Sequence, residues 1–221
     1  MRTILHWTLF AWIAATIWAA FYWAPLAMNF SGIAGQAPQS SRIVFFHVPV
    51  AVASFILFLA AAVSSLLYLW KRDAKHDRAA LAAVEVGLVF CVLATVTGAV
   101  WSEVQWGAFW NWDPRQTSIA LALLFYLAYL SLRGALEDPE TRARIAAAYA
   151  VLGFVVAPFL YFVMPRLAAF SLHPTPGGAE MDASIGIVVV AGIAGYTALA
   201  FWMQSLRSRS LQFDSAFAEI P

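Results

Sequence analysis

The residues with the richest chemistry in this chain gather around residues 102–118, which we call the Trp-rich segment. Four of the ten tryptophans of the chain fall within twelve residues here. They are Trp101, Trp106, Trp110 and Trp112. Because tryptophan offers a large, flat, polarisable face with one donor, several of them beside Asp113 and Arg115 suit a flat apolar ligand with charged edges. The alternative is a membrane aromatic belt, which also gathers tryptophan at the boundary of lipid and water.

Two histidines flank the Trp-rich segment in the sequence, His47 before it and His173 after it. A buried iron porphyrin needs an axial nitrogen on one or both faces, apolar surface against its ring, and a polar or cationic group near its propionates. The histidines, the tryptophans and Arg115 meet these needs if the fold brings them together. Either histidine alone is also explained as a solvated or hydrogen-bonding side chain near a membrane surface.

Two charged residues of the segment have a second explanation each. Asp113 followed by Pro114 is typical of a helix start, with aspartate as the N-cap and proline at the first helical position. We favour capping for this carboxylate, even if it also orients a neighbour. Arg115 could pair with a propionate through a bidentate contact. It could equally extend along the membrane interface with its charge in water.

The spacing of the aromatic residues leaves two geometries open. Trp106 and Trp110 would share one face of a helix, whereas Trp110 and Trp112 would share a face only in an extended segment. Gly107 removes a side chain from the middle of these aromatics. It either permits the close approach of a flat ligand or forms a turn.

The composition indicates what kind of fold must position these residues. The chain of 221 residues is 62% hydrophobic and 11% charged, whereas charged residues make up about a quarter of soluble domains. Crossing a hydrocarbon core of about 30 Å takes roughly 20 helical residues. Six stretches approach or exceed that length: 5–27, 43–70, 80–101, 117–132, 145–165 and 183–206. We therefore predict an all-α integral membrane protein, one domain of six transmembrane helices over residues 1–221.

The basic residues predict how these spans are oriented. In a six-span chain ten of the thirteen fall on one side: Arg2, Lys71, Arg72, Lys75, Arg78, Arg133, Arg142, Arg144, Arg207 and Arg209. The other three are Arg42, Arg115 and Arg166. By the positive-inside rule both termini are cytoplasmic, and the Trp-rich segment is a periplasmic loop between the third and fourth helices. His47 and His173 then face outward, and His6 and His76 face the cytoplasm.

Two further residues of the spans are expected to be structural. The single cysteine, Cys91, excludes an internal disulfide, a CxxCH haem-attachment site and a cysteine-ligated iron–sulfur cluster, and we interpret it as a small buried residue. Glu85 lies only about five residues into the third span, which favours a structural role over an intramembrane function. The sequence has no GxxxxGK[ST] loop, so any ATP-driven step needs a separate subunit.

The run from Trp106 to Thr117, WGAFWNWDPRQT, resembles the WGxxWxWDxRxT signature of the WWD family of haem-handling proteins of cytochrome c maturation. With six spans and about 220 residues, the chain is most similar to the CcmC branch of that family, since the CcmF and CcsA branches have more spans. The resemblance implies that His47 and His173 ligate haem iron. The expected haem-binding residues of the segment are Trp106, Gly107, Phe109, Trp110, Trp112, Asp113 and Arg115.

The resemblance also implies a cargo and a set of partners. Haem is expected as the b type, bound non-covalently and transiently. The partners are the haem chaperone CcmE, the ABC components CcmA and CcmB, the small membrane protein CcmD and the lipid bilayer, and we expect no nucleic acid. Family members often carry tryptophan where this chain has Phe109, which keeps the apolar face and loses the indole donor.

These observations favour a protein of the bacterial inner membrane that holds haem at the periplasmic face and delivers it to CcmE. Because no bond-making residue stands out, we do not expect an enzyme. A b-type cytochrome would ordinarily place histidine pairs near mid-bilayer. A permease for another ligand would want charged groups or broken helices near the midplane, where only Glu85 offers itself. A purely structural membrane subunit is the third alternative.

Overall fold

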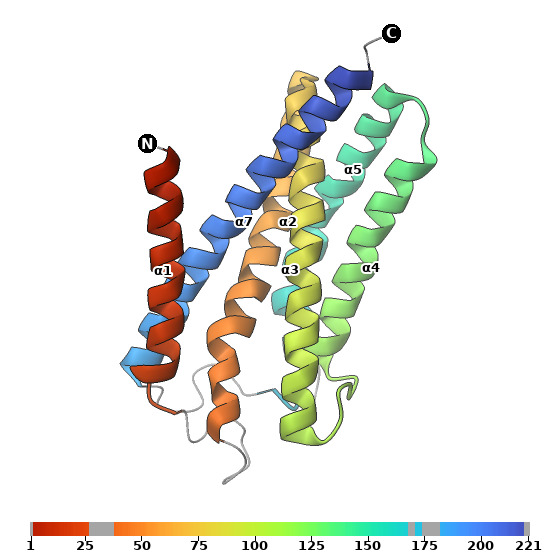
Figure 1. The fold of residues 1–221 in the computed structure, drawn as a ribbon. Helices are drawn as coiled ribbons and strands as arrows, with labels where there is room; N and C mark the ends of the chain where they lie inside the picture. The colour runs from red at the N-terminus through yellow and green to blue at the C-terminus, as the bar shows by residue number, and fades with distance from the viewer. Residues whose placement is uncertain (1, 27–37, 168–170, 174–181, 219–221) are drawn as a thin grey trace.

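The computed structural model describes residues 2–26, 38–167, 171–173 and 182–218, and within these ranges the regular structure is entirely helical (Figure 1). Six helical stretches are long and apolar enough to cross a membrane, as predicted. The elements in chain order are α1 (Arg2–Tyr22), the 3₁₀ helix η1 (Pro38–Ile43), α2 (Val44–Lys71), α3 (Ala74–Trp106), α4 (Pro114–Ala135), α5 (Pro139–Pro158), the π-helix η2 (Phe159–Val163), α6 (Met164–Leu167) and α7 (Ala183–Ala218).

The helix ends differ from the predicted spans most clearly at α3. This helix runs from Ala74 to Trp106, where hydropathy alone predicted 80–101. Asp73 caps its start by accepting a hydrogen bond from the Lys75 backbone N–H at 2.9 Å. Gly107 ends it in the left-handed conformation at φ 73°. Helix length is therefore set by these caps, and polar residues that lie outside the apolar run still continue the helix.

The helices α2 and α3 form the centre of the bundle, and α5 and α7 pack against α2 (Figure 1). The α4 helix packs on α3 and α5, while α1 makes its main contact with α7. The core contains Phe58 of α2 stacked on Tyr126 of α4, with ring centroids 3.6 Å apart. Gly87 of α3 lets α2 approach, since a Cβ there would lie 2.8 Å from the Phe58 ring. Cys91 is fully buried in the same cluster, which confirms its predicted burial.

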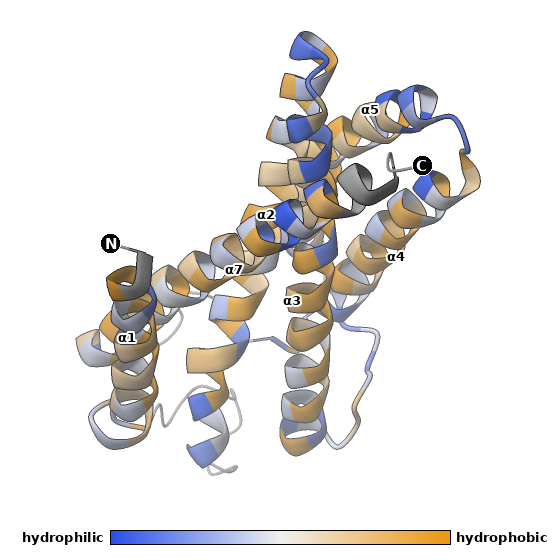
Figure 2. Ribbon diagram, turned by 45° about the horizontal axis from the view of Figure 1, so that its top comes forward, coloured by the Kyte–Doolittle hydropathy of each residue, from blue (hydrophilic) through white to orange (hydrophobic). Residues whose placement is uncertain are grey.

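The connections gather at two opposite ends of the bundle. The α2–α3 and α4–α5 connections lie toward one end, and residues 107–113 and 171–173 lie at the other (Figure 1). The α4–α5 connection is hydrophilic, whereas the middles of α3 and α4 are largely hydrophobic (Figure 2). This arrangement places the two flanking histidines at the same end of the bundle as the Trp-rich segment.

Two ion pairs tie the helices together at the end of the bundle away from the Trp-rich segment. Arg133 of α4 donates to both carboxylate oxygens of Asp77 in α3, at 2.6 and 2.9 Å. Arg207 of α7 donates to both oxygens of Glu85 in α3, at 2.7 and 3.0 Å. Glu85 therefore has the structural role that its shallow position favoured.

We expect Asp77→Ala to lower the free energy of unfolding by about 3 kcal/mol, because the side chains of Arg133 and Asp77 are only 10% and 16% exposed and the guanidinium would stay buried without its partner. The measurement is equilibrium denaturation of the purified chain in mixed micelles. The control is Lys75→Met, which removes the exposed pair with Asp73 (63% and 43% exposed) and should change nothing measurable. If the two variants lower the free energy of unfolding equally, the stabilising role of the buried Arg133–Asp77 pair is wrong.

Candidate functional site

The Trp-rich segment is not a continuous loop. Its first residues, up to Trp106, continue α3, and α4 begins at Pro114, so only residues 107–113 form the connection. At the break, the Gly107 N–H donates to the Glu103 carbonyl at 2.9 Å. Nothing lies within 4 Å of the position where a Gly107 Cβ would be. Glycine is therefore needed for the left-handed turn that ends α3, which is one of its two predicted roles.

Buried amide and hydroxyl side chains hold the connection in place. The Asn111 amide donates to Ser102 Oγ at 2.8 Å and to the Ala108 carbonyl at 3.1 Å. Gln116 of α4 accepts from the Asn111 N–H at 2.8 Å and donates to the Phe109 carbonyl at 3.2 Å. These bonds satisfy polar groups of the connection, in which Phe109 and Trp112 are exposed and Trp110 is partly buried. The sequence analysis did not predict this network. Its trace in the sequence is the presence of three uncharged polar residues, Ser102, Asn111 and Gln116, among the aromatic residues.

The aromatic residues form two edge-to-face pairs. Trp101 and Trp106 pack with ring centroids 4.9 Å apart at 76°, and Trp110 and Trp112 pack at 5.8 Å and 89°. Trp106 and Trp110 do not share a helix face, because α3 ends between them. Trp112 has φ 57°, a left-handed conformation that bulky residues rarely adopt. Its side chain is 72% exposed, and that of Phe109 is 59% exposed, so both present apolar surface outward.

Asp113 is the most connected polar residue of the site and is 1% exposed. As the N-cap of α4, it accepts from the Arg115 N–H at 2.9 Å, which confirms the predicted capping. Its carboxylate also accepts three bonds from residues 171–173: Ser171 Oγ at 3.0 Å, the Leu172 N–H at 2.7 Å and His173 Nδ1 at 2.8 Å. Burial alone would raise the pKa of Asp113, but the bonds from His173 and the Arg115 N–H outweigh it and hold the pKa well below its ordinary value.

His173 is oriented by this carboxylate. An ionised carboxylate can only accept, so Nδ1 is the donor, and in the neutral imidazole the lone pair is then on Nε2. The ring lies against Trp106 and Trp101, with centroids 5.1 and 5.8 Å away. Histidines that bind metals usually donate their other ring N–H to a carboxylate or carbonyl in this way.

His47 lies near the start of α2 and contacts the same stretch of α3. Its Nδ1 lies 3.0 Å from Thr97 Oγ1, and its ring lies against Gly98. The helix begins at Val44, so Pro49 falls inside α2. His47 contacts Gly98 and His173 contacts Trp101, and these two residues are about 4.5 Å apart along α3.

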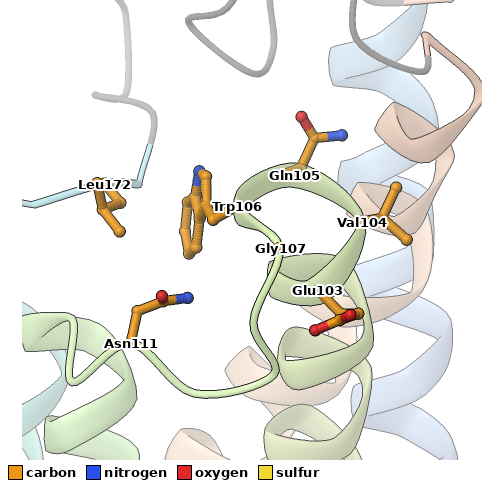
Figure 3. A pocket seen from close by; sticks show the side chains of 7 residues that line it. All are labelled: Glu103, Val104, Gln105, Trp106, Gly107, Asn111 and Leu172. Carbon is orange, nitrogen blue, oxygen red and sulfur yellow. The ribbon is translucent and has the colours of Figure 1, made fainter.

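A pocket of about 600 Å³ opens beside the end of α3 (Figure 3). It is lined by Glu103, Val104, Gln105, Trp106, Gly107, Asn111 and Leu172. In Figure 3, Trp106, Leu172 and Asn111 gather on one side of it. Its volume lies within the range of about 300 to 1,000 Å³ that is usual for small-molecule sites. Of the predicted haem-binding residues, Trp106 and Gly107 line this pocket, while Phe109, Trp110, Trp112, Asp113 and Arg115 lie outside its lining.

Arg115 provides a cation near these groups. Its backbone N–H donates to Asp113, and within the described part of the chain its half-buried guanidinium has no hydrogen-bond or ion-pair partner. Arg166 and Asp113 lie within electrostatic range of it. A guanidinium held this way can receive an anionic group of a ligand.

Comparison with known proteins gives consistent matches over most of the chain. The family described as Heme exporter protein C matches residues 1–217. The chain is 33% identical to Heme exporter protein C of Rhodobacter capsulatus over 207 residues, which cover 90% of this chain and 84% of the relative. It is 40% identical to that of Paracoccus denitrificans over 176 residues, covering 76% and 72%. It is 27% identical to that of Escherichia coli K12, covering 80% and 72%.

The carboxylate of Asp113 should hold residues 171–173 more firmly than a capping role alone requires. Asp113→Asn keeps one acceptor oxygen for the cap but presents an NH₂ group where Ser171 and Leu172 donate. We expect the amide of Leu172 to exchange with deuterium about tenfold faster or more, measured by hydrogen exchange with mass spectrometry. Asp138, which caps α5 and is also followed by proline, supplies the matched control. If Asp138→Asn accelerates exchange at Leu172 equally, the specific role of Asp113 is wrong.

Proposed function

The chain belongs to the Heme exporter protein C family, and from this we propose that it holds haem at the periplasmic face of the bacterial inner membrane and delivers it to the haem chaperone CcmE. Membership in the family establishes the coarser statement, a multi-pass membrane protein with a role in haem export for cytochrome c biogenesis. The histidine ligands, the orientation and the partners are the finer part of the proposal.

The observation that carries the proposal is the meeting of His47 and His173 on α3. They are 126 positions apart in the chain, yet one contacts Gly98 and the other Trp101. Each ring is hydrogen-bonded through Nδ1, by Thr97 in one case and Asp113 in the other. This leaves the Nε2 atoms as the available iron ligands. Haem needs axial nitrogen ligands next to apolar surface, which the adjoining Trp101 and Trp106 supply.

In this proposal the remaining residues hold the cargo without trapping it. The outward aromatic faces of Phe109 and Trp112 cover the porphyrin, and the guanidinium of Arg115 receives a propionate. Haem is bound non-covalently as the b type, because Cys91 is buried in the bundle away from this end. An open pocket beside Trp106 leaves an edge of the site accessible to a partner. A site that passes haem on must bind it reversibly.

The proposed partners are those that membership in the family implies. Without a GxxxxGK[ST] loop, ATP hydrolysis falls to the ABC components CcmA and CcmB, and CcmD completes the membrane complex. A permease would need polar groups near the midplane, and Glu85, the acidic residue on which that alternative relied, is bound to Arg207. The two outward histidines also argue against a purely structural subunit.

We expect the detergent-purified chain to show a haem Soret band that weakens or shifts in His47→Ala and in His173→Ala, because each variant removes one axial nitrogen. Trp110→Ala should also weaken the band by removing apolar surface. The measurement is the absorption spectrum of the oxidised and reduced protein. The controls are His6→Ala and His76→Ala, at the cytoplasmic side in this topology, which should leave the spectrum unchanged. An unchanged band in both His47 and His173 variants would refute the axial assignment.

The proposed orientation is tested by thiol accessibility in intact cells or spheroplasts. Phe109→Cys places an exposed thiol at the end of the bundle that carries the site, and Lys75→Cys places one at the opposite end. We expect a membrane-impermeant maleimide to label the first from the periplasm and the second only after the membrane is opened. The native Cys91 is fully buried and contributes no label. The reverse labelling order would overturn the periplasmic placement.

A further inference from the structure

We propose that Thr97 is a positioning residue that fixes the proton of His47 on Nδ1 and so presents Nε2 to the haem iron. The inference rests on the proposed function, since it concerns one of the two iron ligands. It adds a residue outside the Trp-rich segment, on the membrane-spanning part of α3. Three observations support it: the hydrogen bonds of the Thr97 hydroxyl, the space over Gly98, and the different arrangement at His173.

The hydroxyl of Thr97 has one proton, and this proton is donated within α3. Thr97 Oγ1 donates to the Leu93 carbonyl at 2.7 Å, with the Ala94 carbonyl at 3.2 Å. The oxygen therefore meets His47 Nδ1, at 3.0 Å, with a lone pair. With the hydroxyl proton on the Leu93 carbonyl, Nδ1 of His47 is the donor in this contact. The neutral imidazole then has its free lone pair on Nε2, the form that binds a metal.

Gly98 provides the space that the imidazole of His47 occupies. A Cβ at position 98 would lie 2.9 Å from Cε1 of His47 and 3.5 Å from its Nδ1. The absence of a side chain thus lets the ring lie directly against the α3 backbone, next to the hydroxyl that it contacts. His47 is held on two sides by consecutive residues of one helix turn, and its rotation is restricted accordingly.

The two histidines are consequently held by chemically different acceptors. His173 donates to the carboxylate of Asp113, a charged acceptor, whereas His47 donates to a neutral hydroxyl. A hydrogen bond to a charged acceptor is the stronger of the two and gives more electron density to the imidazole. His47 therefore depends on placement by Thr97 and Gly98, without the charge that supports His173.

The test is titration of hemin into the detergent-purified full chain, read by absorbance and by the low-spin signal of six-coordinate iron. Thr97→Val keeps the shape of the side chain and loses the acceptor, and we expect about tenfold weaker hemin binding with a larger high-spin fraction. Thr97→Ser restores the hydroxyl and should resemble the wild type. Should Thr97→Val fail to accumulate, Thr97→Ala supplies a second variant without the acceptor.

The matched control is Thr95→Val on the same helix. Thr95 makes the same kind of bond, from its hydroxyl to the Cys91 carbonyl at 2.8 Å, and contacts neither histidine through it. We expect its variant to bind hemin like the wild type. If His47→Ala weakens binding while Thr97→Val behaves like Thr95→Val, the role of Thr97 is wrong and the proposed function stands. If His47→Ala binds hemin unchanged, the ligand assignment itself fails.

Discussion

The buried carboxylate of Asp113 is the interaction on which the site depends. It caps α4 through the Arg115 N–H and at the same time receives three bonds from residues 171–173. Those two segments are nearly sixty residues apart in the chain, and this one side chain brings them together. The bond from His173 Nδ1 to this carboxylate orients the ring that packs against Trp101 and Trp106.

The second constraint is the length of α3. Its 33 residues extend about 50 Å at 1.5 Å per residue, well beyond a hydrocarbon core of about 30 Å. The helix makes different contacts toward its two ends. Asp77 and Glu85 join α4 and α7 near its start, and Thr97, Gly98 and Trp101 carry both imidazoles toward its end. One rigid helix therefore serves as the common support of the bundle and of the site.

The sequence predicted what depends on composition and on neighbouring residues. Six spans follow from hydropathy because unpaired polar groups are costly in lipid, and the Asp113 cap follows from the Asp-Pro pair. The turn at Gly107 was one of two alternatives that the sequence offered, whereas the Asn111 network and the Thr97 contact with His47 did not follow. The contact with His47 depends on where a distant segment packs, and a Thr in an apolar helix can also bond back to its own helix without a further partner. Hydropathy therefore predicts the membrane-spanning helices, while contacts between side chains of different helices determine the geometry of the site.

The position of the site at the start of α4 has a physical reason. A charged carboxylate is expensive to bury, and more so at membrane depth. At a helix N-terminus it meets unpaired N–H groups and the positive end of the helix dipole, which offset that cost. Asp113 uses this place and adds donors from Ser171, Leu172 and His173. A buried anion next to an imidazole is therefore least costly at such a helix start, where a candidate membrane span begins.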